Sequence, residues 1–568
     1  MKEIPVNRIF RLAALAVLTA LALSAYGDNT TGRASSQVQQ DVQQKGEPRG
    51  SQWGRDLDGP RHRRGLDKIK TVVIIYAENR GYDSLYGLFP GANGIRQLHK
   101  KKYAAQKDFD GSTLPVLPPT WGGMTAPGQS PVVTQAQTTG LPNKPFAIDN
   151  DFGLPTSVIT RDLVHRFYNN QMQIDSGKND KFAAYSDAGG LVMGHYDGSE
   201  SDMALWKIAK KYVLADNFFM GAFGGSFLNH QYLICACAPQ YPNADAPESP
   251  AKNSISAIDV DAEGNFVRLT LAATSPASVL DGPAVYLKDG TLTPADAKGM
   301  FYAVNTMQPP YQPSGNPPTS TDSTLMFSDP TKANTLPPQA QTNIGDLLSA
   351  KRVSWAWYAG SWNAALADGE QPAATTRAVI YTNPVQFQAH HHPFNYYAEF
   401  DPVAHASDRA QHLRDYTDFV AAAEAGTLPA VAFYKPQGNL NQHAGYADVA
   451  GGDAHLAEVI GALKQSPQWK HMLIILTYDE NGGFWDHVRP PKGDRWGPGT
   501  RVPTIIVSPF AKRGYVDHTQ YDTASILRFI TRRFDLPSLP GLVERDRALA
   551  HSGYKRMGDL TNALELSR

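Results

Sequence analysis

The chain has 568 residues and carries 53 lysines and arginines against 54 aspartates and glutamates, which gives a formal net charge of −1. A chain with this charge balance has no strong net electrostatic attraction for a nucleic acid or an anionic membrane, so neither is predicted as a partner. The length is sufficient for one large α/β domain with an elaborated second lobe, or for two domains.

The amino terminus has the composition of an export signal. After a basic start, residues 12–23 form an apolar run of signal-peptide length, too short to span a membrane. Tyr26 stands where a lipoprotein signal would carry its acylated cysteine, so we expect cleavage near Ala25 or Gly27 and no lipid anchor. No later segment is apolar enough to cross a bilayer. We therefore predict a periplasmic or secreted protein with a signal peptide at residues 1–27, a flexible polar spacer at 28–67 and a catalytic domain at 68–568.

The first element expected after the spacer is a strand that begins at Thr71. Residues 71–77 form an unbroken, mostly aliphatic run that stops at Glu78 and Asn79. Runs of this kind are typical of central parallel strands that are covered on both faces. Ligands of open α/β sheets bind beyond the carboxyl ends of such strands, so both polar residues are candidates for a binding site. The following residues, 105–160, are rich in proline, threonine and glycine and predict long ordered loops.

A serine on a glycine turn is the most informative feature of the chain. A helical pattern at residues 202–211 leads into an apolar run, and two glycines then precede Ser226. Glycines allow a sharp turn and a close approach to a ligand, so the Ser226 hydroxyl is expected to stand clear at a strand end. A helix that starts at Ser226 would place Asn229 and His230 one turn further along the same face, where we expect them to support the site.

The two cysteines of the chain, Cys235 and Cys237, are separated by one residue. In a strand they would share a face, but a bridge between them would strain the backbone, which favours buried free thiols. No disulfide framework is expected, and the export prediction depends on the signal alone.

The composition of the middle of the chain predicts an insert. Between about residues 240 and 340 the composition shifts to proline, serine, threonine and aspartate, with short β-prone pieces such as residues 284–287. This segment is either a cap that restricts the active site or an elaboration of the surface.

Regular alternation of strands and helices returns after the insert. It predicts a mostly parallel sheet with helices on both faces and no tandem repeat. The expected strands are residues 353–358, 429–434, 472–478 and 502–508, and the expected helices are 407–425, 454–464 and 523–534.

The strand at residues 472–478 ends, like the first one, on two polar residues, Asp479 and Glu480. Strand ends that supply carboxylate and amide oxygens, together with a serine on a glycine turn, fit a hard or borderline divalent metal that activates a hydroxyl group. The ligand types do not choose among iron, manganese, zinc, calcium and magnesium.

These motifs resemble those of the bacterial phosphoesterase family, which unites phospholipases C with acid phosphatases. The resemblance spans roughly residues 68–537 and implies an alkaline-phosphatase-like α/β fold that cleaves phosphomonoesters or phosphodiesters. The matching segments, in chain order, are residues 76–94, 162–168, 224–226, 390–396, 441–443 and 478–487.

The resemblance also implies roles for individual residues. Histidines are expected to line the phosphate site, namely His165, His443 and one of the run 390–392, for which we choose His391. Asp486 and His487 either orient the metal ligands and close the pocket or belong to an ordinary polar loop. One divalent metal ion is implied, with Ser226 as both ligand and nucleophile and with four further ligands, Glu78, Asn79, Asp479 and Glu480.

The predicted function is that of an exported, metal-dependent acid phosphatase that hydrolyses small phosphomonoesters through a phosphoserine intermediate. Protonated histidines would hold the phosphate and protonate the leaving group at neutral to acidic pH. A phospholipase C that cleaves phosphodiester head groups is the alternative. The phospholipase branch typically has a threonine after Gly-Pro where this chain has Ser226 after Gly-Gly, and this difference favours the phosphatase branch. A non-catalytic binding protein is disfavoured, because the nucleophile and the acidic ligands are all present. The oligomeric state is left open.

Overall fold

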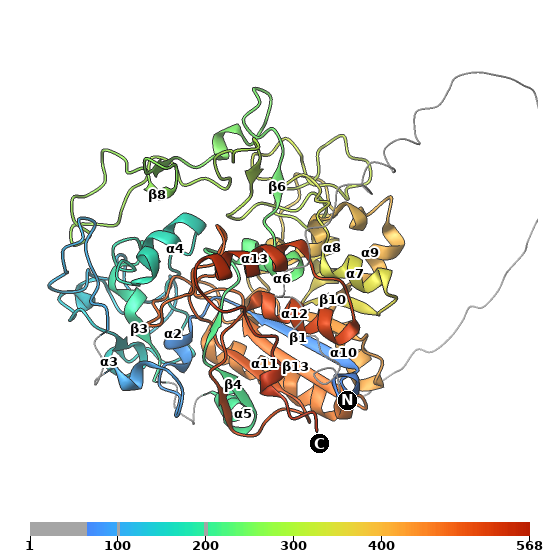
Figure 1. The fold of residues 1–568 in the computed structure, drawn as a ribbon. Coiled ribbons are helices and arrows are strands. Elements are labelled where there is room, and N and C mark those ends of the chain that lie inside the picture. The colour runs from blue at the N-terminus through green and yellow to red at the C-terminus, as the bar shows by residue number, and fades with distance from the viewer. Residues whose placement is uncertain (1–64, 99–102, 198–202, 568) are drawn as a thin grey trace, which may run out of the picture. The chain divides into compact units, whose positions relative to one another are not determined.

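A computed structural model of the chain describes residues 65–98, 103–197 and 203–567 (Figure 1). The predicted signal peptide, Tyr26 and nearly all of the predicted spacer lie outside the described residues. In the part of the chain that is described, no helix has both the length and the apolar character needed to cross a membrane.

An eight-stranded sheet forms the centre of the fold, in the order β11-β10-β12-β1-β13-β14-β4-β15. Every pairing is parallel except the two made by β14, which runs antiparallel to both β13 and β4. The strands are β11 (Leu413–Asp415), β10 (Trp355–Ala359), β12 (Val431–Lys435), β1 (Thr71–Ala77), β13 (Met472–Tyr478), β14 (Thr504–Val507), β4 (Val213–Ala215) and β15 (Tyr515–Asp517).

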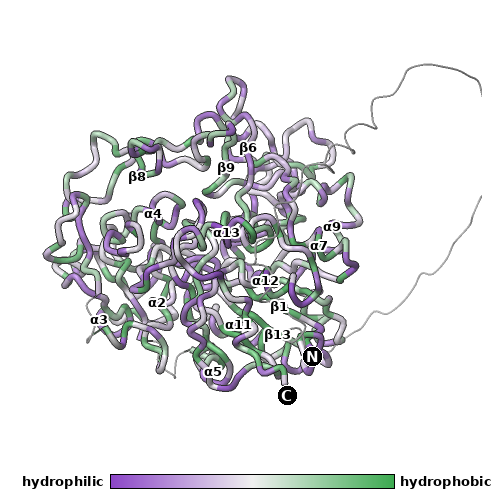
Figure 2. Tube along the Cα trace, in the orientation of Figure 1, coloured by the Kyte–Doolittle hydropathy of each residue, from purple (hydrophilic) through white to green (hydrophobic). Residues whose placement is uncertain are grey.

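Helices cover both faces of this sheet, as the alternation of elements predicts. In Figure 1, α6 and α12 lie on one side of β1 and β13, and α5 and α11 lie on the other. All residues of β1 and β13 are buried, and Figure 2 shows hydrophobic residues gathered along these central strands. The helices are α2 (Tyr82–Tyr86), α3 (Ile148–Phe152), α4 (Phe167–Ile174), α5 (Ala204–Lys211), α6 (Ser226–Cys235), α7 (Ile344–Ala350), α8 (Trp362–Gly369), α9 (Ala406–His412), α10 (Tyr416–Ala425), α11 (Val449–Gln465), α12 (Thr523–Phe534) and α13 (Pro540–His551).

Most expected elements are present, but the helix predicted at residues 407–425 is not continuous. It is divided into α9 and α10 by the short edge strand β11. Asp415 ends this strand and caps α10, since its carboxylate accepts the backbone N–H of Thr417 and the Asp418 carboxylate accepts the N–H of Asp415. This reciprocal cap starts a new helix. A further helix, α13, follows the predicted last helix.

The prediction of free thiols is wrong, because Cys235 and Cys237 form a disulfide bond. The prediction assumed a strand, whereas Cys235 is the last residue of α6 and Ala236 adopts a left-handed conformation with φ of 51°. This turn brings the two Cα atoms to 5.1 Å, within the range that a disulfide bond requires.

The segment from residue 240 to 340 consists of loops with short antiparallel strand pairs, β6 with β9 and β7 with β8 (Figure 1). It packs against α4: the Phe167 N–H donates to Asn305 Oδ1, and Arg166 forms an ion pair with Asp289. Its role as a cap or a surface elaboration stays a prediction. The remaining short strands are β6 (Gln240–Tyr241), β9 (Phe301–Tyr302), β7 (Ile258–Val260), β8 (Phe266–Leu269), β2 (Phe146–Ala147), β3 (Gly194–His195), β5 (Phe218–Phe219) and β16 (Tyr521–Asp522).

Candidate active site

Two adjacent strands deliver four polar residues to one edge of the sheet. Strands β1 and β13 pair in parallel with Ala77 opposite Tyr478, so the residues that follow them start at the same level. Asn79 has a left-handed φ of 48° and donates its backbone N–H to Asp479 Oδ1 at 3.0 Å. Glu78, Asp479 and the following Glu480 are completely buried. The two strand ends that the sequence singles out therefore lie side by side, and their role as metal ligands stays a prediction.

Ser226 is the first residue of α6, as predicted, and it faces the end of β1. Its Oγ lies 2.9 Å from Glu78 Oε2 and 3.1 Å from Asn79 Oδ1, so the hydroxyl proton can be donated to either oxygen. The preceding turn requires glycine: Gly224 has a φ of 84°, and a Cβ there would lie 2.4 Å from the Phe167 backbone nitrogen.

Asn229 holds this turn closed from the next turn of α6. Its Oδ1 accepts the N–H of Ala222 at 2.9 Å, and its Nδ2 donates to the carbonyl oxygen of Ala222 at 3.1 Å. The carbonyl of Gly224 lies 3.3 Å from the same Nδ2. These contacts fix the segment that positions Ser226, which is the kind of support that the sequence predicts.

His230 and His391 lie together beside Glu78. Their rings stack with centroids 4.8 Å apart and nearly parallel planes. His230 Nδ1 bonds to the Ser226 carbonyl at 2.8 Å, while its Nε2 lies 3.7 Å from Glu78 Oε1. His391 Nε2 lies 3.4 Å from Glu78 Oε2. Burial lowers the pKa of both histidines well below the ordinary value.

Of the three adjacent histidines, His391 is the one beside Glu78. His390 bonds through Nδ1 to the Tyr381 hydroxyl at 2.8 Å and stacks on the Tyr381 ring. The ring of His392 lies 4.2 Å from that of Trp362. The structure therefore places His391 beside Glu78, and its role at the phosphate site stays a prediction.

His165 and His443 form a second pair of histidines, and His165 lies beside Asn79. Their ring centroids are 5.4 Å apart. The Leu163 carbonyl accepts from His165 Nδ1 at 2.6 Å, which leaves Nε2 to accept from Asn79 Nδ2 at 3.3 Å. His443 Nδ1 donates to the Ala444 carbonyl, and burial lowers the pKa of this histidine well below the ordinary value.

Lys435 is a site residue that the sequence reasoning missed. It is the last residue of β12 and is buried, with its ammonium bonded to Glu78 Oε1 and, at 3.1 Å, to the Tyr76 carbonyl. The signal that would have found it is its position, since it directly follows the predicted strand at residues 429–434 as Glu78 follows the first strand.

The carboxylates of the site have too few partners. Burial, and then the nearby Asp479 carboxylate, raise the pKa of Glu78 well above its ordinary value, although Lys435 opposes the shift. The same two causes raise the pKa of Glu480. Buried side-chain atoms of this site that find no hydrogen-bond partner among the described residues include Asp479 Oδ2, Glu480 Oε1, His230 Nε2 and His391 Nε2.

This donor set fits a divalent metal ion. Buried anionic oxygens without partners are costly unless a cation compensates them. Glu78, His230 and His391 each offer a ligand atom within 4.8 Å of the others, as do Asp162, His165 and His443. The geometry thus adds imidazole nitrogens to the oxygen donors that the sequence predicts.

Asp486 and His487 do not join this site. The Asp486 carboxylate binds Arg501 Nε at 3.0 Å, and Arg501 Nη2 lies 3.1 Å from Asp83 Oδ1. His487 Nδ1 bonds to Asp83 Oδ2 at 2.6 Å. We call these four residues the Arg501 cluster. Among the described contacts of Asp486 and His487, none reaches the predicted metal ligands, so their expected role in orienting those ligands gains no support.

Comparison with known proteins identifies several related sequences. A model of the Phosphoesterase family matches residues 69–537. Non-specific phospholipase C6 of Arabidopsis thaliana is 38% identical over 117 residues, which are 16% of this chain and 22% of that protein. The non-hemolytic phospholipase C of Pseudomonas aeruginosa is 28% identical over 175 residues, covering 25% and 24%. Phospholipase C B of Mycobacterium tuberculosis is 30% identical over 145 residues, covering 21% and 28%. The matched part spans only about a quarter of these curated relatives.

Solved structures show weaker likenesses. Ps i-CgsB aligns with a TM-score of 0.27 and 10% identity, covering 64% of this chain and 72% of that one. Murine ectonucleotide pyrophosphatase/phosphodiesterase 5 aligns with a TM-score of 0.25 and 9% identity, covering 59% and 91%. A protein in the alkaline phosphatase superfamily from Vibrio parahaemolyticus aligns with a TM-score of 0.20 and 11% identity, covering 36% and 50%. No conclusion about this chain depends on these overlaps.

Proposed function

This chain belongs to the phosphoesterase family, and we propose that it is an exported, metal-dependent acid phosphatase that hydrolyses small phosphomonoesters through a phosphoserine intermediate. The observation that carries the proposal is the position of Ser226, whose hydroxyl lies within hydrogen-bonding distance of Glu78 and Asn79 at the edge where Asp479 and Glu480 also emerge. Export is supported by the signal-like composition of residues 12–23.

The residues proposed to hold one divalent metal ion are Glu78, Asn79, Ser226, Asp479 and Glu480. When bound, such an ion lowers the pKa of a serine hydroxyl and neutralises charge on phosphoryl oxygens. The unpartnered oxygens of Asp479 and Glu480 support this assignment. The nearby nitrogens of His230 and His391 make a metal that accepts imidazole as well as carboxylate a good candidate.

The chain's own residues supply positioning and proton transfer. Ser226 Oγ is the nucleophile, and Glu78 Oε2, 2.9 Å away, can accept its proton. The Asn79 backbone N–H donates to Asp479, and the Asn79 side-chain oxygen accepts from the Ser226 hydroxyl, so the nucleophile is held before substrate arrives. Attack on phosphorus forms the Ser226–phosphate bond as the alcohol leaves, and water then releases phosphate.

The protonation state of the histidines depends on whether a phosphate lies beside them. Burial lowers the pKa of His443 and His391 well below the ordinary value, which favours the neutral imidazole when no anion lies beside it. A phosphate dianion placed beside them favours their protonation, because an adjacent opposite charge stabilises the imidazolium form. Proton uptake on substrate binding would then supply the acid that protonates the leaving alkoxide.

A phospholipase C is the second candidate function. The observation in its favour is that several similar proteins are named phospholipases C. The turn with Ser226 after two glycines favours the phosphatase.

The test compares release of p-nitrophenol from p-nitrophenyl phosphate and from p-nitrophenylphosphorylcholine at mildly acidic pH, with divalent metals supplied. We expect faster release from the monoester. Faster release from the choline diester would assign the chain to the phospholipases. Failure to hydrolyse either compound with any of the divalent metals would contradict both proposals.

A further inference from the structure

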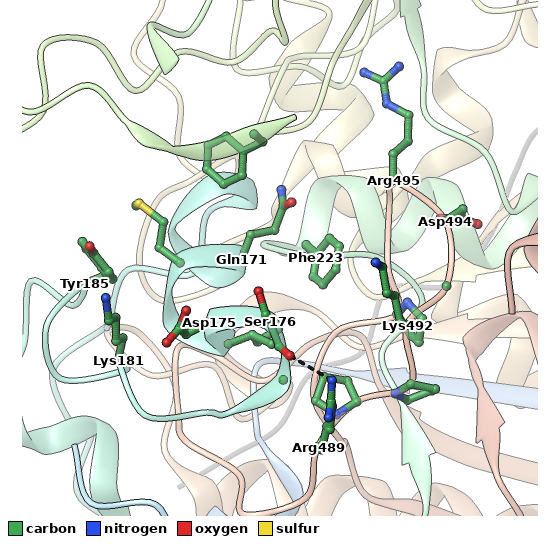
Figure 3. A pocket seen from close by; sticks show the side chains of 18 of the residues that line it. Gln171, Asp175, Ser176, Lys181, Tyr185, Phe223, Arg489, Lys492, Asp494 and Arg495 are labelled. Atoms are coloured by element: carbon green, nitrogen blue, oxygen red, sulfur yellow. Dashed lines mark hydrogen bonds between the residues drawn. The ribbon is translucent and has the colours of Figure 1, made fainter. Parts of the chain in front are cut away.

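A second pocket lies between α4, strand β8 of the insert and the loop at residues 489–498 (Figure 3). Its volume is about 560 Å³, within the range of small-molecule sites. None of its lining residues belongs to the proposed metal ligands or to the histidines beside Ser226. Any ligand of this pocket would therefore occupy a site separate from the one that performs the chemistry.

The lining of the pocket is positively charged. Its two acidic residues are already neutralised: Asp175 accepts from Lys178 Nζ at 2.9 Å, and Asp494 accepts from Arg545 Nε at 2.7 Å. Neither of those two cations lines the pocket. The basic residues of the lining come from two segments of the chain and are Lys181, Arg489, Lys492 and Arg495.

The four cations differ in how firmly the protein holds them, and the charge of Lys181 acts on the nearby Asp175 without an ion pair. Arg489 donates to the Ser176 carbonyl at 3.2 Å, and Arg495 lies over the Trp496 ring at 4.4 Å. By contrast, no hydrogen bond or ion pair with a described residue holds the ammonium group of Lys181 or Lys492. In Figure 3, Lys181 lies at one end of the pocket and Lys492 at the other.

Apolar groups separate the two lysines. Phe223 and Phe266 line the pocket and are both only partly buried. In the view of Figure 3, Phe223 lies between Lys181 and Lys492. Aromatic faces gain free energy when a flat apolar group covers them, and a lysine ammonium pairs with phosphate, sulfonate or carboxylate oxygens.

We propose that this pocket is a second binding site for an elongated organic anion with an aromatic or other apolar body and a charged group at each end. One charged group binds Lys181, the other binds Lys492, and the body covers Phe223 and Phe266. Because Phe223 stands three residues before Ser226, the ligand also contacts the segment that carries the nucleophile.

Fluorescence titration with 1,5-naphthalenedisulfonate tests the site, using the full-length protein in its metal-loaded form. This probe has the proposed shape and is not a phosphoester, so turnover does not consume it. We expect saturable binding at one site, weakened roughly fivefold by Lys181→Gln and by Lys492→Gln, the range of a partly exposed charge pair. Lys144→Gln, which changes an exposed lysine outside the pocket, is the matched control and should bind like the parent.

Equal affinity in the parent and in both lysine variants would overturn the proposal, as would equal binding of uncharged naphthalenemethanol. Displacement of the probe by inorganic phosphate in proportion to occupancy of the Ser226 site would also overturn it, because the probe would then share that site. The outcome is distinguishable from that of the phosphatase assay, since binding is measured without phosphoester hydrolysis.

Discussion

The Ser226 site and the Arg501 cluster are built from the same kinds of side chain but balance their charges differently. In the Arg501 cluster, a buried guanidinium binds Asp83 and Asp486, and His487 adds a second donor to Asp83. At the Ser226 site, Lys435 pairs with Glu78, while one oxygen each of Asp479 and Glu480 stays without a partner.

This difference teaches that a group of carboxylates and histidines indicates a metal only where the protein supplies too few donors of its own. Asp83, Asp486 and His487 have ligand atoms close enough to hold an ion, yet Arg501 already binds both carboxylates and His487 bonds to Asp83. A buried Arg–carboxylate pair with good geometry compensates the charges of both side chains. A buried carboxylate without such a partner is stable in its charged form only when another cation binds it.

The largest expected effect is on catalysis at the Ser226 site. Ser226→Ala removes the nucleophile, so turnover of p-nitrophenyl phosphate should fall by about a thousandfold or more, which corresponds to about 4 kcal/mol of barrier. The melting temperature should remain near that of the parent. Activity close to the parent would rule out Ser226 as the nucleophile.

The next effect concerns stability in the Arg501 cluster. Arg501→Met leaves Asp83 and Asp486 buried without their cation and should lower the free energy of unfolding by about 3–5 kcal/mol. Chemical denaturation measures the change. As a control, Arg268→Met breaks the exposed ion pair with Asp259 and should cost less than about 1 kcal/mol. A similar small loss for both variants would show that the cluster is not a structural one.

Metal retention should differ between variants of the Ser226 site and variants of the Arg501 cluster. Asp479→Asn keeps the shape of the side chain but removes its charge, so metal affinity should fall by at least about tenfold. The matched variant Asp486→Asn, in the Arg501 cluster, should lose stability and keep its metal. Metal content after dialysis against a weak chelator distinguishes the variants. Equal metal content in the parent and in Asp479→Asn would remove this residue from the ligand set.

The smallest effect is a pH dependence of the Arg501 cluster. Burial lowers the pKa of His487, but the charge of Asp83 and its hydrogen bond to the imidazole raise this pKa by more. The pKa of His487 therefore lies above its ordinary value of 6.5. Burial raises the pKa of Asp83, but the nearby His487 and Arg501 lower it by more. The net pKa of Asp83 lies below its ordinary value, so this carboxylate is ionised at neutral pH. The His487–Asp83 pair therefore stabilises the fold fully below the unfolded pKa of histidine, and this contribution is lost as pH rises through the folded pKa.

The variant His487→Gln checks this sign. The difference in unfolding free energy between the parent and His487→Gln should be largest near pH 5.5 and should shrink by about 1 kcal/mol toward pH 8.5. A difference that grows with pH would contradict the proposed pairing. The control is His471→Gln, which removes an imidazole that bonds to the Lys68 carbonyl rather than to a carboxylate.

Much of the fold was predictable because its signals are local. The apolar runs of β1 and β13 and the helix at Thr523–Phe534 follow from short stretches of sequence. The antiparallel direction of β14 was not predictable, since strand direction depends on which neighbours pair with it. The Cys235–Cys237 bond was missed because it requires a left-handed Ala236 at the end of a helix rather than a strand.

By itself, the sequence determined the family motifs, the serine at the start of a helix and the polar residues at two strand ends. Only the tertiary structure decided which groups meet there: it brought Lys435 to Glu78 across 357 residues, selected His391 from three adjacent histidines, and placed Asp486 with Arg501 instead of with the metal ligands. The physical reason is the distance along the chain over which each kind of interaction acts. Strand and helix starts are set by neighbouring residues, whereas charge pairing inside a core is set by packing between segments that are distant in the chain.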